Sequence, residues 1–416
     1  MGASVVDKVF VSYAVGWDLR GRAAVGPLSR EQAEARDAEG EPYVMVHRVA
    51  GRREPVEVHL VDWGASYVGV WGYDEWGRRK AEADWRLLEE ERVFLLRVGA
   101  WLYVSAEQEE FGGDVTWVRQ ELYPDGKGRK VVERPRGGAT HTPADIDEGD
   151  RWLGRGALGV GGEGWLLVSG ETGTAPVVVD AEEAEPAEPV HEPQLWVSPR
   201  PAEPAYLTEL FTVGTKFSTD VQPEMTVVGV REIARLRVPS GRLVVADPSA
   251  DGRELVQGFA PGTYPMQEAV VGYEYDFMGE HVETEDPVAV RLLLRDEPVA
   301  AWELALASGE DVRLLHDGGG FGFGTDGALG SFADASGWDT HVDQVMTYYR
   351  RHSEKVPVDF VADGHLRSVD ESTGSDLICF PTAGDGGYPV WLGRSASGEA
   401  VSFVVVTDYL SDLRPL

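Results

Sequence analysis

Cysteine, lysine and asparagine are scarce or absent in this chain of 416 residues. Its single cysteine, Cys379, excludes an internal disulfide framework and a zinc site built from several cysteines. Basic side chains are also few: 38 Lys and Arg stand against 71 Asp and Glu, giving a formal net charge of −33. A nucleic-acid or anionic-membrane surface needs Lys and Arg to neutralise phosphates. We therefore expect no nucleic-acid and no membrane partner, and the charge favours a basic protein partner.

Long apolar runs are missing as well. The longest, such as residues 401–406, are far shorter than the ~20 residues that span a bilayer. Residues 1–8 show no basic region followed by an apolar core, so no signal peptide is expected. These absences predict a soluble cytoplasmic protein.

Proline and glutamate are concentrated in residues 173–205, which contain seven prolines and several closely spaced glutamates. Proline has no backbone N–H to donate, and like charges repel, so this segment is predicted to be extended and weakly packed. We interpret it as an acidic linker between an N-terminal domain (1–172) and a C-terminal domain (206–416). The alternative is an ordered crossing that packs through Leu195 and Trp196.

Short apolar or alternating runs separated by glycine-containing turns predict strands in both halves, as at 56–61, 93–98, 242–246 and 288–294. Asp-Gly and Ser-Gly pairs, such as Asp125-Gly126 and Ser240-Gly241, suit turns that need a positive φ. Helical patterns are few, and they cover 29–36, 81–92 and 339–352. Because strands do not alternate regularly with helices, we predict a mainly β protein. It would have two β-rich domains of sandwich or open-barrel type with a few short helices.

Motifs of common enzyme classes are missing or lack their structural context. The sequence has no phosphate-binding loop, no His-Glu-x-x-His and no Gly-x-Ser-x-Gly. Residues 154–159 match Gly-x-Gly-x-x-Gly, but no buried strand precedes them and no helix follows. Cys379 lies in an apolar run without a neighbouring base, which is typical of a core residue. We predict no catalytic residue, no cofactor and no metal site.

A stretch rich in glycine and aspartate, residues 317–334, leaves two interpretations open. Flexible backbone and several carboxylates could wrap a hard cation such as calcium. The stretch lacks the regular spacing and bidentate glutamate of the helix–loop–helix calcium motif. Tight turns whose aromatic side chains pack inward are therefore the favoured interpretation.

An ordered series of motifs runs from Tyr206 to the end of the chain. It includes Val-Pro-Ser-Gly-Arg-Leu-Val-Val-Ala-Asp-Pro (238–248), Ala-Pro-Gly-Thr-Tyr-Pro (260–265), Gly-Phe-Gly-Thr-Asp-Gly-Ala-Leu-Gly-Ser-Phe-Ala-Asp (322–334), Gly-Asp-Gly-Gly-Tyr-Pro-Val-Trp-Leu-Gly (384–393) and Val-Thr-Asp (406–408). This series resembles the bacterial domain-of-unknown-function family 4241 and covers about half of the chain. The resemblance implies a shared fold and no established activity, and it does not extend to residues 1–172.

Seven residues of the C-terminal half combine carboxylates with aromatic rings. If strand ends meet on one face, they form a candidate ligand-binding site made of Asp247, Tyr264, Asp326, Asp334, Asp385, Tyr388 and Asp408. Such groups suit a cationic, sugar-like or metal-bridged ligand. The alternative is that the same residues serve only as scaffolding.

Three functions therefore remain open. The charge favours a non-enzymatic binding protein, such as an immunity-type factor that covers a basic toxin. One alternative is a metal- or carboxylate-dependent hydrolase that uses the C-terminal aspartates. The other is a module whose tryptophan-rich hairpins bind carbohydrate or another small ligand.

Overall fold

The computed structural model describes residues 8–161, 177–180, 192–351, 356–362, 364–408 and 413–416. The chain forms two compact units, Met1–Arg200 and Pro201–Leu416. No helix in the described part of the chain is long and apolar enough to cross a membrane.

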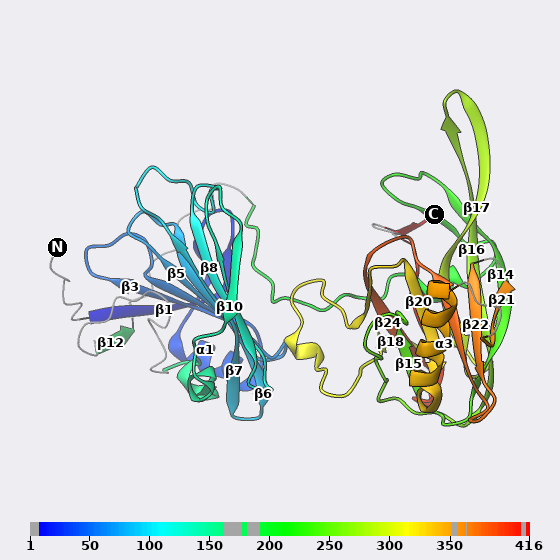
Figure 1. The fold of residues 1–416 in the computed structure, drawn as a ribbon. Coiled ribbons are helices and arrows are strands. Elements are labelled where there is room, and N and C mark those ends of the chain that lie inside the picture. The colour runs from blue at the N-terminus through cyan, green and yellow to red at the C-terminus, as the bar shows by residue number, and fades with distance from the viewer. Residues whose placement is uncertain (1–7, 162–176, 181–191, 352–355, 363, 409–412) are drawn as a thin grey trace. The chain divides into compact units, whose positions relative to one another are not determined.

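The N-terminal unit is built on one large sheet, drawn in blue to green in Figure 1. Its strands are β1 (Lys8–Asp18), β2 (Ala23–Leu28), β3 (Tyr43–Val49), β4 (Glu57–Asp62), β5 (Tyr67–Tyr73), β6 (Arg79–Glu89), β7 (Arg92–Leu102), β8 (Thr116–Leu122), β9 (Gly128–Glu133), β10 (Ala139–Pro143), β11 (Trp152–Gly154) and β12 (Val177–Asp180). Their order is β10-β9-β8-β7-β6-β5-β4-β3-β1-β12, with β2 beside β1 and β11 beside β7. From β3 to β10, each strand pairs with the next along the chain. Short turns therefore build most of this sheet.

The central strands of this sheet are buried on both faces. On one face, Trp17, Val58 and Leu60 form a core to which Trp196 adds its ring. On the other face, β4 places Glu57 and His59 in the interior. Apolar residues thus cover one side of β4, while the other side holds buried ionisable groups.

In the described residues of this unit, three helical elements accompany the sheet: α1 (Arg30–Glu39), η1 (Glu148–Arg151) and η2 (Arg155–Ala157). Helix α1 begins with a capping box, in which the Ser29 hydroxyl accepts from the Gln32 N–H at 3.2 Å and the Gln32 side chain accepts from the Ser29 N–H at 2.8 Å. Gly40, with φ 75°, ends the helix in the left-handed conformation. The helix predicted at 29–36 is confirmed.

The helix predicted at 81–92 is wrong, because these residues form β6 and the turn into β7. Alternate residues of β6 point to opposite faces, and the carboxylate of Asp84 pairs with Arg97 on β7 at 2.7 Å. Asp84 also accepts a hydrogen bond from the Tyr67 hydroxyl on β5 at 2.8 Å. Cross-strand pairing therefore overrides the helix propensity of an Ala-, Glu- and Arg-rich segment.

The C-terminal unit contains two sheets and a covering helix. Its larger sheet has the order β18-β24-β25-β17-β16-β14-β13-β26, with β19 beside β24. The bounds are β13 (Lys216–Ser218), β14 (Met225–Val238), β16 (Gly262–Phe277), β17 (Glu280–Leu293), β18 (Ala301–Leu304), β19 (Gly322–Thr325), β24 (Gly386–Arg394), β25 (Ala400–Val406) and β26 (Arg414–Pro415). The smaller sheet, β15-β20-β23-β22-β21, consists of β15 (Leu243–Ala246), β20 (Leu329–Asp334), β21 (Val358–Ala362), β22 (His365–Asp370) and β23 (Ser375–Pro381).

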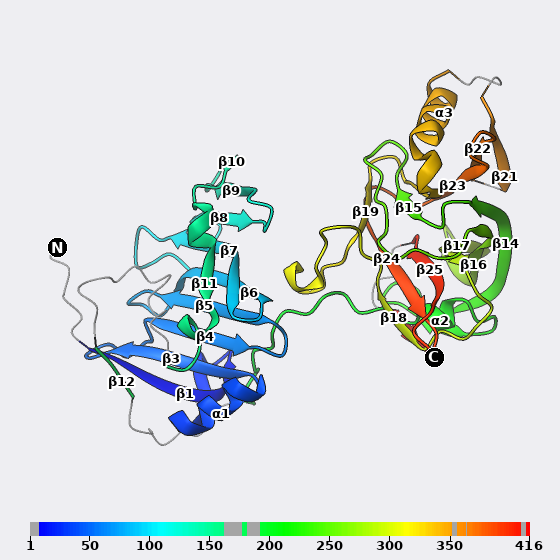
Figure 2. The same ribbon diagram turned by 90° about the horizontal axis from the view of Figure 1, so that it is seen from below.

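The two sheets of this unit pack face to face. Their shared core joins Leu236 and Phe403 of the larger sheet to Phe332 and Phe380 of the smaller one. The other face of the smaller sheet is covered by α3 (Trp338–Arg351), as Figure 2 shows. The remaining short helices are α2 (Leu207–Leu210), η3 (Val312–Leu314) and η4 (Ala335–Gly337).

The predicted fold class is confirmed. Both units are mainly β with a few short helices, and the sheets formed by the described strands do not close into a barrel. The helix predicted at 339–352 is also confirmed as α3, and Cys379 lies buried on β23.

The described end of the predicted linker contacts both units. In the N-terminal unit, the Trp196 N–H donates to the Trp17 carbonyl at 2.8 Å, and the Ser198 hydroxyl donates to Asp62 at 2.6 Å. In the C-terminal unit, the Ala202 N–H donates to the Gly319 carbonyl at 2.7 Å. Residues 181–191, which contain most of the linker's glutamates, lie outside the described residues.

Candidate functional site

Five of the seven predicted site residues lie at one end of the C-terminal unit, four of them on loops that hydrogen bonds connect and Tyr388 near the start of β24. These five are Asp247, Asp326, Asp385, Tyr388 and Asp408. The Thr325 hydroxyl donates to Asp247 at 2.5 Å, which joins the loop after β15 to the loop after β19. The N–H groups of residues 382 and 383 donate to the carbonyls of residues 328 and 407, at 3.0 and 2.8 Å. These bonds bring the loops of Asp385 and Asp408 to the same end.

The other two predicted residues lie elsewhere. Asp334 pairs with Leu243 at the start of β15, whereas Asp247 follows the end of that strand. A strand of this length spans about 10 Å, so the two aspartates do not share a site. Tyr264 pairs with Leu236, and its hydroxyl donates to the Ala260 carbonyl.

The buried members of the predicted set are occupied by bonds to their own surroundings. Asp334 accepts from the N–H and hydroxyl of Ser240 at 2.8 and 2.7 Å, and from the Ser336 N–H at 2.8 Å. The Tyr388 ring stacks on Phe323 at 5.7 Å, inside the core. Asp326 and Asp385 are exposed. Anchoring of loops accounts for the buried carboxylates of Asp247 and Asp334, and ligand binding by the exposed Asp326 and Asp385 stays a prediction.

A cluster of arginine and aromatic side chains, missed by the sequence reasoning, lies in the N-terminal unit. The guanidinium carbon of Arg79 lies 4.4 Å from the ring centre of Trp71 and 4.8 Å from that of Phe111. Trp101 contributes a third ring at 5.5 Å. Three rings around one cation stabilise it through their negative faces. We call Trp71, Arg79, Trp101 and Phe111 the aromatic cage.

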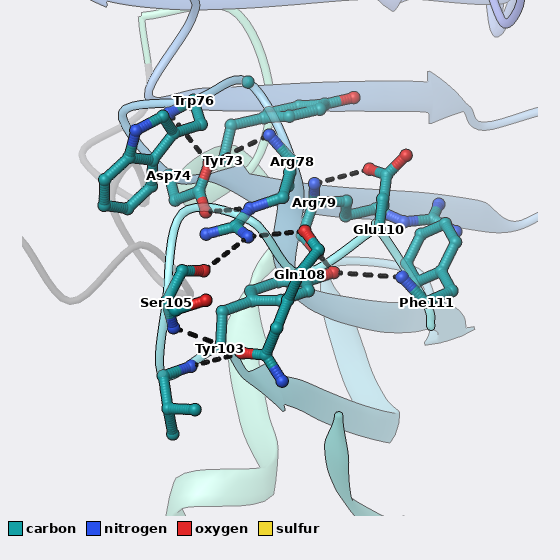
Figure 3. A network of polar contacts seen from close by, with 12 residues as sticks. Tyr73, Asp74, Trp76, Arg78, Arg79, Tyr103, Ser105, Gln108, Glu110 and Phe111 are labelled. Atoms are coloured by element: carbon teal, nitrogen blue, oxygen red, sulfur yellow. Dashed lines mark hydrogen bonds and ion pairs between the residues drawn. The ribbon is translucent and has the colours of Figure 1, made fainter. Parts of the chain in front are cut away.

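Arg78, next in the chain, holds a loop beside the aromatic cage (Figure 3). Its guanidinium pairs with Asp74 at 2.7 Å and donates to the carbonyls of Ser105 and Gln108 at 2.9 and 2.8 Å. The Tyr103 ring lies 4.1 Å from the same guanidinium. This network fixes the loop that carries Glu110 and Phe111.

Glu110 connects the loop to the strands. One of its oxygens accepts from the backbone N–H of Arg79 at 2.6 Å, and the other pairs with Arg22. A hollow of about 120 Å³ opens here, lined by Trp17, Leu19, Arg22, Trp71, Tyr73, Arg79, Glu110 and Phe111. A cavity of about 150 Å³ holds benzene, so this smaller, open hollow suits a short side chain or one edge of a small ring. The aromatic spacing alone does not reveal the cluster, because Arg79 and Phe111 meet only through the fold.

The C-terminal unit carries a larger depression on its major sheet. This acidic groove of about 750 Å³ is lined by Gln222, Pro223, Glu224, Thr226, Val228, Gly272, Tyr273, Glu274, Glu283, Thr284 and Glu285. Lys216 pairs with Glu224 at 2.5 Å, and Arg231 pairs with Glu285 at 2.7 Å. Glu274 and Glu283 face each other across β16 and β17, and these two strands extend beyond the sheet as a projecting hairpin (Figure 1).

His341 and Cys379 of the C-terminal unit are buried away from solvent. The ring nitrogens of His341 lie 3.0 Å from the hydroxyls of Ser368 and Ser375, and the whole side chain is buried. Burial lowers the pKa of His341. Burial, with the charge of Asp247, raises the pKa of Cys379 far above its ordinary value. Neither group is both ionised and accessible, as a nucleophile requires.

Residues 236–405 match the model of the family described as "Protein of unknown function (DUF4241)". The resemblance carried by the C-terminal motifs is thereby confirmed for this segment, which lies within the C-terminal unit. No curated protein and no solved structure matches the chain. The match supports a common fold for this segment, and the family description names no activity.

Proposed function

We propose that this protein is a non-enzymatic binding protein whose acidic groove and projecting hairpin take a basic protein partner. The observation that carries the proposal is the outer hairpin, residues 274–283. On one side, β14 pairs with β16 only as far as Tyr273, and on the other β25 pairs with β17 only from Ala289. The outer hairpin therefore extends from the described sheet as two strands. Such a hairpin is marginally stable alone, which fits a segment that is completed by a partner.

The tip of the outer hairpin exposes apolar side chains beside the carboxylates. Phe277 and Met278 are 57% and 91% exposed. Met278 and Gly279 form the two-residue turn, with φ of 51° and 85°. The left-handed conformation costs a residue with a Cβ about 1–2 kcal/mol, and Asn or Gly would relieve it. Keeping methionine at that position retains an apolar contact group where a partner would dock.

Charge supports the same proposal at longer range. A net charge of −33 accelerates encounter with a cationic protein and repels nucleic acid. The partner that fits is a basic protein with an apolar depression that accepts the tip. More specifically, we propose an immunity-type factor that covers a basic toxin in the cytoplasm.

The hydrolase alternative receives less support. In the described residues, His341 is enclosed between two serines and Cys379 is buried in the core. Asp247 and Asp334 are engaged by neighbouring hydroxyl and N–H groups. An acid–base pair must reach its substrate, and these groups line neither the acidic groove nor the hollow beside the aromatic cage.

The test compares binding by matched variants. The wild-type chain is used to capture partners from the native cell, and mass spectrometry identifies them. Glu274→Gln/Glu283→Gln removes two groove charges, and Glu203→Gln/Glu209→Gln removes two exposed charges elsewhere in the same unit. We expect the groove variant to lower the association rate several-fold more than the control variant, and rising salt to reduce that difference. Equal effects of the two variants, or an acidic partner, would contradict the proposal.

The hollow beside the aromatic cage favours a second candidate function, the binding of a small ring such as a sugar. Aromatic faces with adjacent Arg and Glu side chains are typical of sites that orient one polar ring. Phe111→Ala should weaken binding in a saccharide panel, while Trp76→Ala, outside the lining, should not. Retention of binding by Phe111→Ala would exclude this site.

A further inference from the structure

Two carboxylates and an imidazole meet on one face of the outer hairpin. Glu274 is directly opposite Glu283, and His281 is directly opposite Asp276, in the next pair of the same face. One ligand atom each of Glu274, His281 and Glu283 lies within 4.8 Å of the others. The short turn at the tip fixes this register, so the three side chains are placed together by the backbone.

The arrangement is unfavourable for the hairpin when no cation is bound. Like charges directly opposite each other on neighbouring strands destabilise a β pair. His281 Nε2 lies 3.3 Å from Glu274, but a single imidazole faces three carboxylates on this side of the hairpin. Among the described residues of the outer hairpin, there is no lysine or arginine to balance them.

Both ring nitrogens of His281 face carboxylates. Nε2 is directed to Glu274, and Nδ1 lies 3.5 Å from Asp276. An imidazole that binds a metal through one nitrogen commonly donates its other N–H to a carboxylate, which orients the ring and raises its basicity. Asp276 occupies the position of that supporting carboxylate.

We propose that Glu274, His281 and Glu283 bind one divalent transition-metal ion of the zinc class. Nitrogen from imidazole together with carboxylate oxygen suits zinc, whereas calcium and magnesium take oxygen ligands alone. Ligands of a tetrahedral zinc ion lie about 3.3 Å apart. The ligand atoms of the three exposed side chains lie within 4.8 Å of one another. A small change of rotamer would therefore bring them to the spacing that zinc requires. Water fills the remaining coordination positions, because the site opens to solvent.

A bound ion would change the hairpin in two ways. It would replace the repulsion between Glu274 and Glu283 with a cross-link between β16 and β17. It would also reduce the negative charge at the edge of the acidic groove. The site is built entirely from this chain, so it does not depend on the proposed partner.

The experiment measures the binding of zinc alone to the purified full chain by isothermal titration calorimetry. The buffer contains no chelator, and no partner protein is present. We expect a saturable site that His281→Gln removes and that Glu274→Gln and Glu283→Gln each weaken. Asp276→Asn should weaken it by about tenfold, as loss of a supporting carboxylate does. The control is His316→Gln, an exposed histidine outside the hairpin, which should bind zinc as the wild type does.

Two results of the zinc titrations would overturn this proposal. One is a wild-type chain without saturable zinc binding. The other is a His281→Gln variant that binds zinc with unchanged affinity. The four site variants are on the exposed hairpin and the control is outside it, and circular dichroism and melting temperature check that each one is folded. Magnesium at the same concentrations should not compete for the site, and effective competition would indicate an oxygen-only site instead. Partner capture is a separate assay, so either proposal can fail without the other.

Discussion

Ionisable side chains are buried in the N-terminal unit as a small cluster that the structure places on one face of β3 and β4. The rings of His47 and His59 lie 4.7 Å apart, and His59 Nε2 lies 2.7 Å from Glu57. All three side chains are inside the unit. The pKa of His47 is lowered well below its ordinary value, mainly by burial and to a smaller extent by the charge of the neighbouring His59.

This lowered pKa predicts a loss of stability in mild acid. The unfolded chain protonates His47 near pH 6.5, while the folded chain does so only at lower pH, so the unfolded state binds more protons in that window. Stability is therefore full above about pH 6.5 and falls as the pH drops below it, by up to about 1.4 kcal/mol per pH unit for one group. Urea unfolding at pH 7.0 and 5.5 measures the slope. We expect His47→Gln to reduce it, and an unchanged slope would contradict the assignment.

Cys379 gives a second prediction at the same scale. Its thiol is fully buried, and burial together with Asp247 raises its pKa, so the reactive thiolate is hardly formed at neutral pH. Alkylation by iodoacetamide should be slow in the native protein and fast in urea. Labelling at equal rates in both conditions would mean that the thiol is exposed.

At the scale of elements, the sequence predicts those whose signals are local. The capping box of α1 lies within four neighbouring residues, and Asp125-Gly126 forms the turn between β8 and β9. Strand β6 was not predicted because the contacts that stabilise it come from other strands. Asp84 contacts Tyr67 and Arg97, which lie on the two adjacent strands. The aromatic cage was missed for the same reason. Of the five predicted residues at one end of the C-terminal unit, four lie just outside a strand end and Tyr388 lies near the start of β24, which are local signals, and their binding of a ligand stays a prediction.

The tip of the outer hairpin provides a prediction for a single element. Met278→Asn should relieve the left-handed strain, since Asn-Gly is the preferred pair for a type I′ turn. Relief of about 1 kcal/mol corresponds to up to about fivefold slower hydrogen exchange of the outer hairpin amides. The same variant should weaken partner binding, because it removes the exposed methionine. Faster exchange in Met278→Asn would show that the side chain of Met278 stabilises the hairpin.

For the whole molecule, composition predicts the broad properties and leaves the detail to the fold. The excess of carboxylates is the basis on which a basic partner is proposed, but only the structure shows that Glu224 and Glu285 are paired with cations while Glu274 and Glu283 face each other. The proline-rich segment predicts a boundary between domains. The packing of Trp196 and Ser198 on the N-terminal unit depends on contacts with residues 17 and 62, far away in the chain.

The composition of the linker predicts where a protease cuts the chain, and these contacts predict whether the fragments stay together. A glutamate-specific protease should cleave first among Glu182, Glu183, Glu185 and Glu188, where proline and like charges disfavour packing in the sequence-based prediction. Bonds from Trp196 and Ser198 attach the segment that follows to the N-terminal unit. The C-terminal fragment therefore keeps a segment that belongs to the N-terminal unit, and we expect the two fragments to elute together on gel filtration and to separate in urea. Ser198→Ala removes the hydroxyl that donates to Asp62 and should promote separation at lower urea concentration. First cleavage outside residues 181–191, or fragments that separate at once in buffer, would contradict both the predicted linker and the role of this segment.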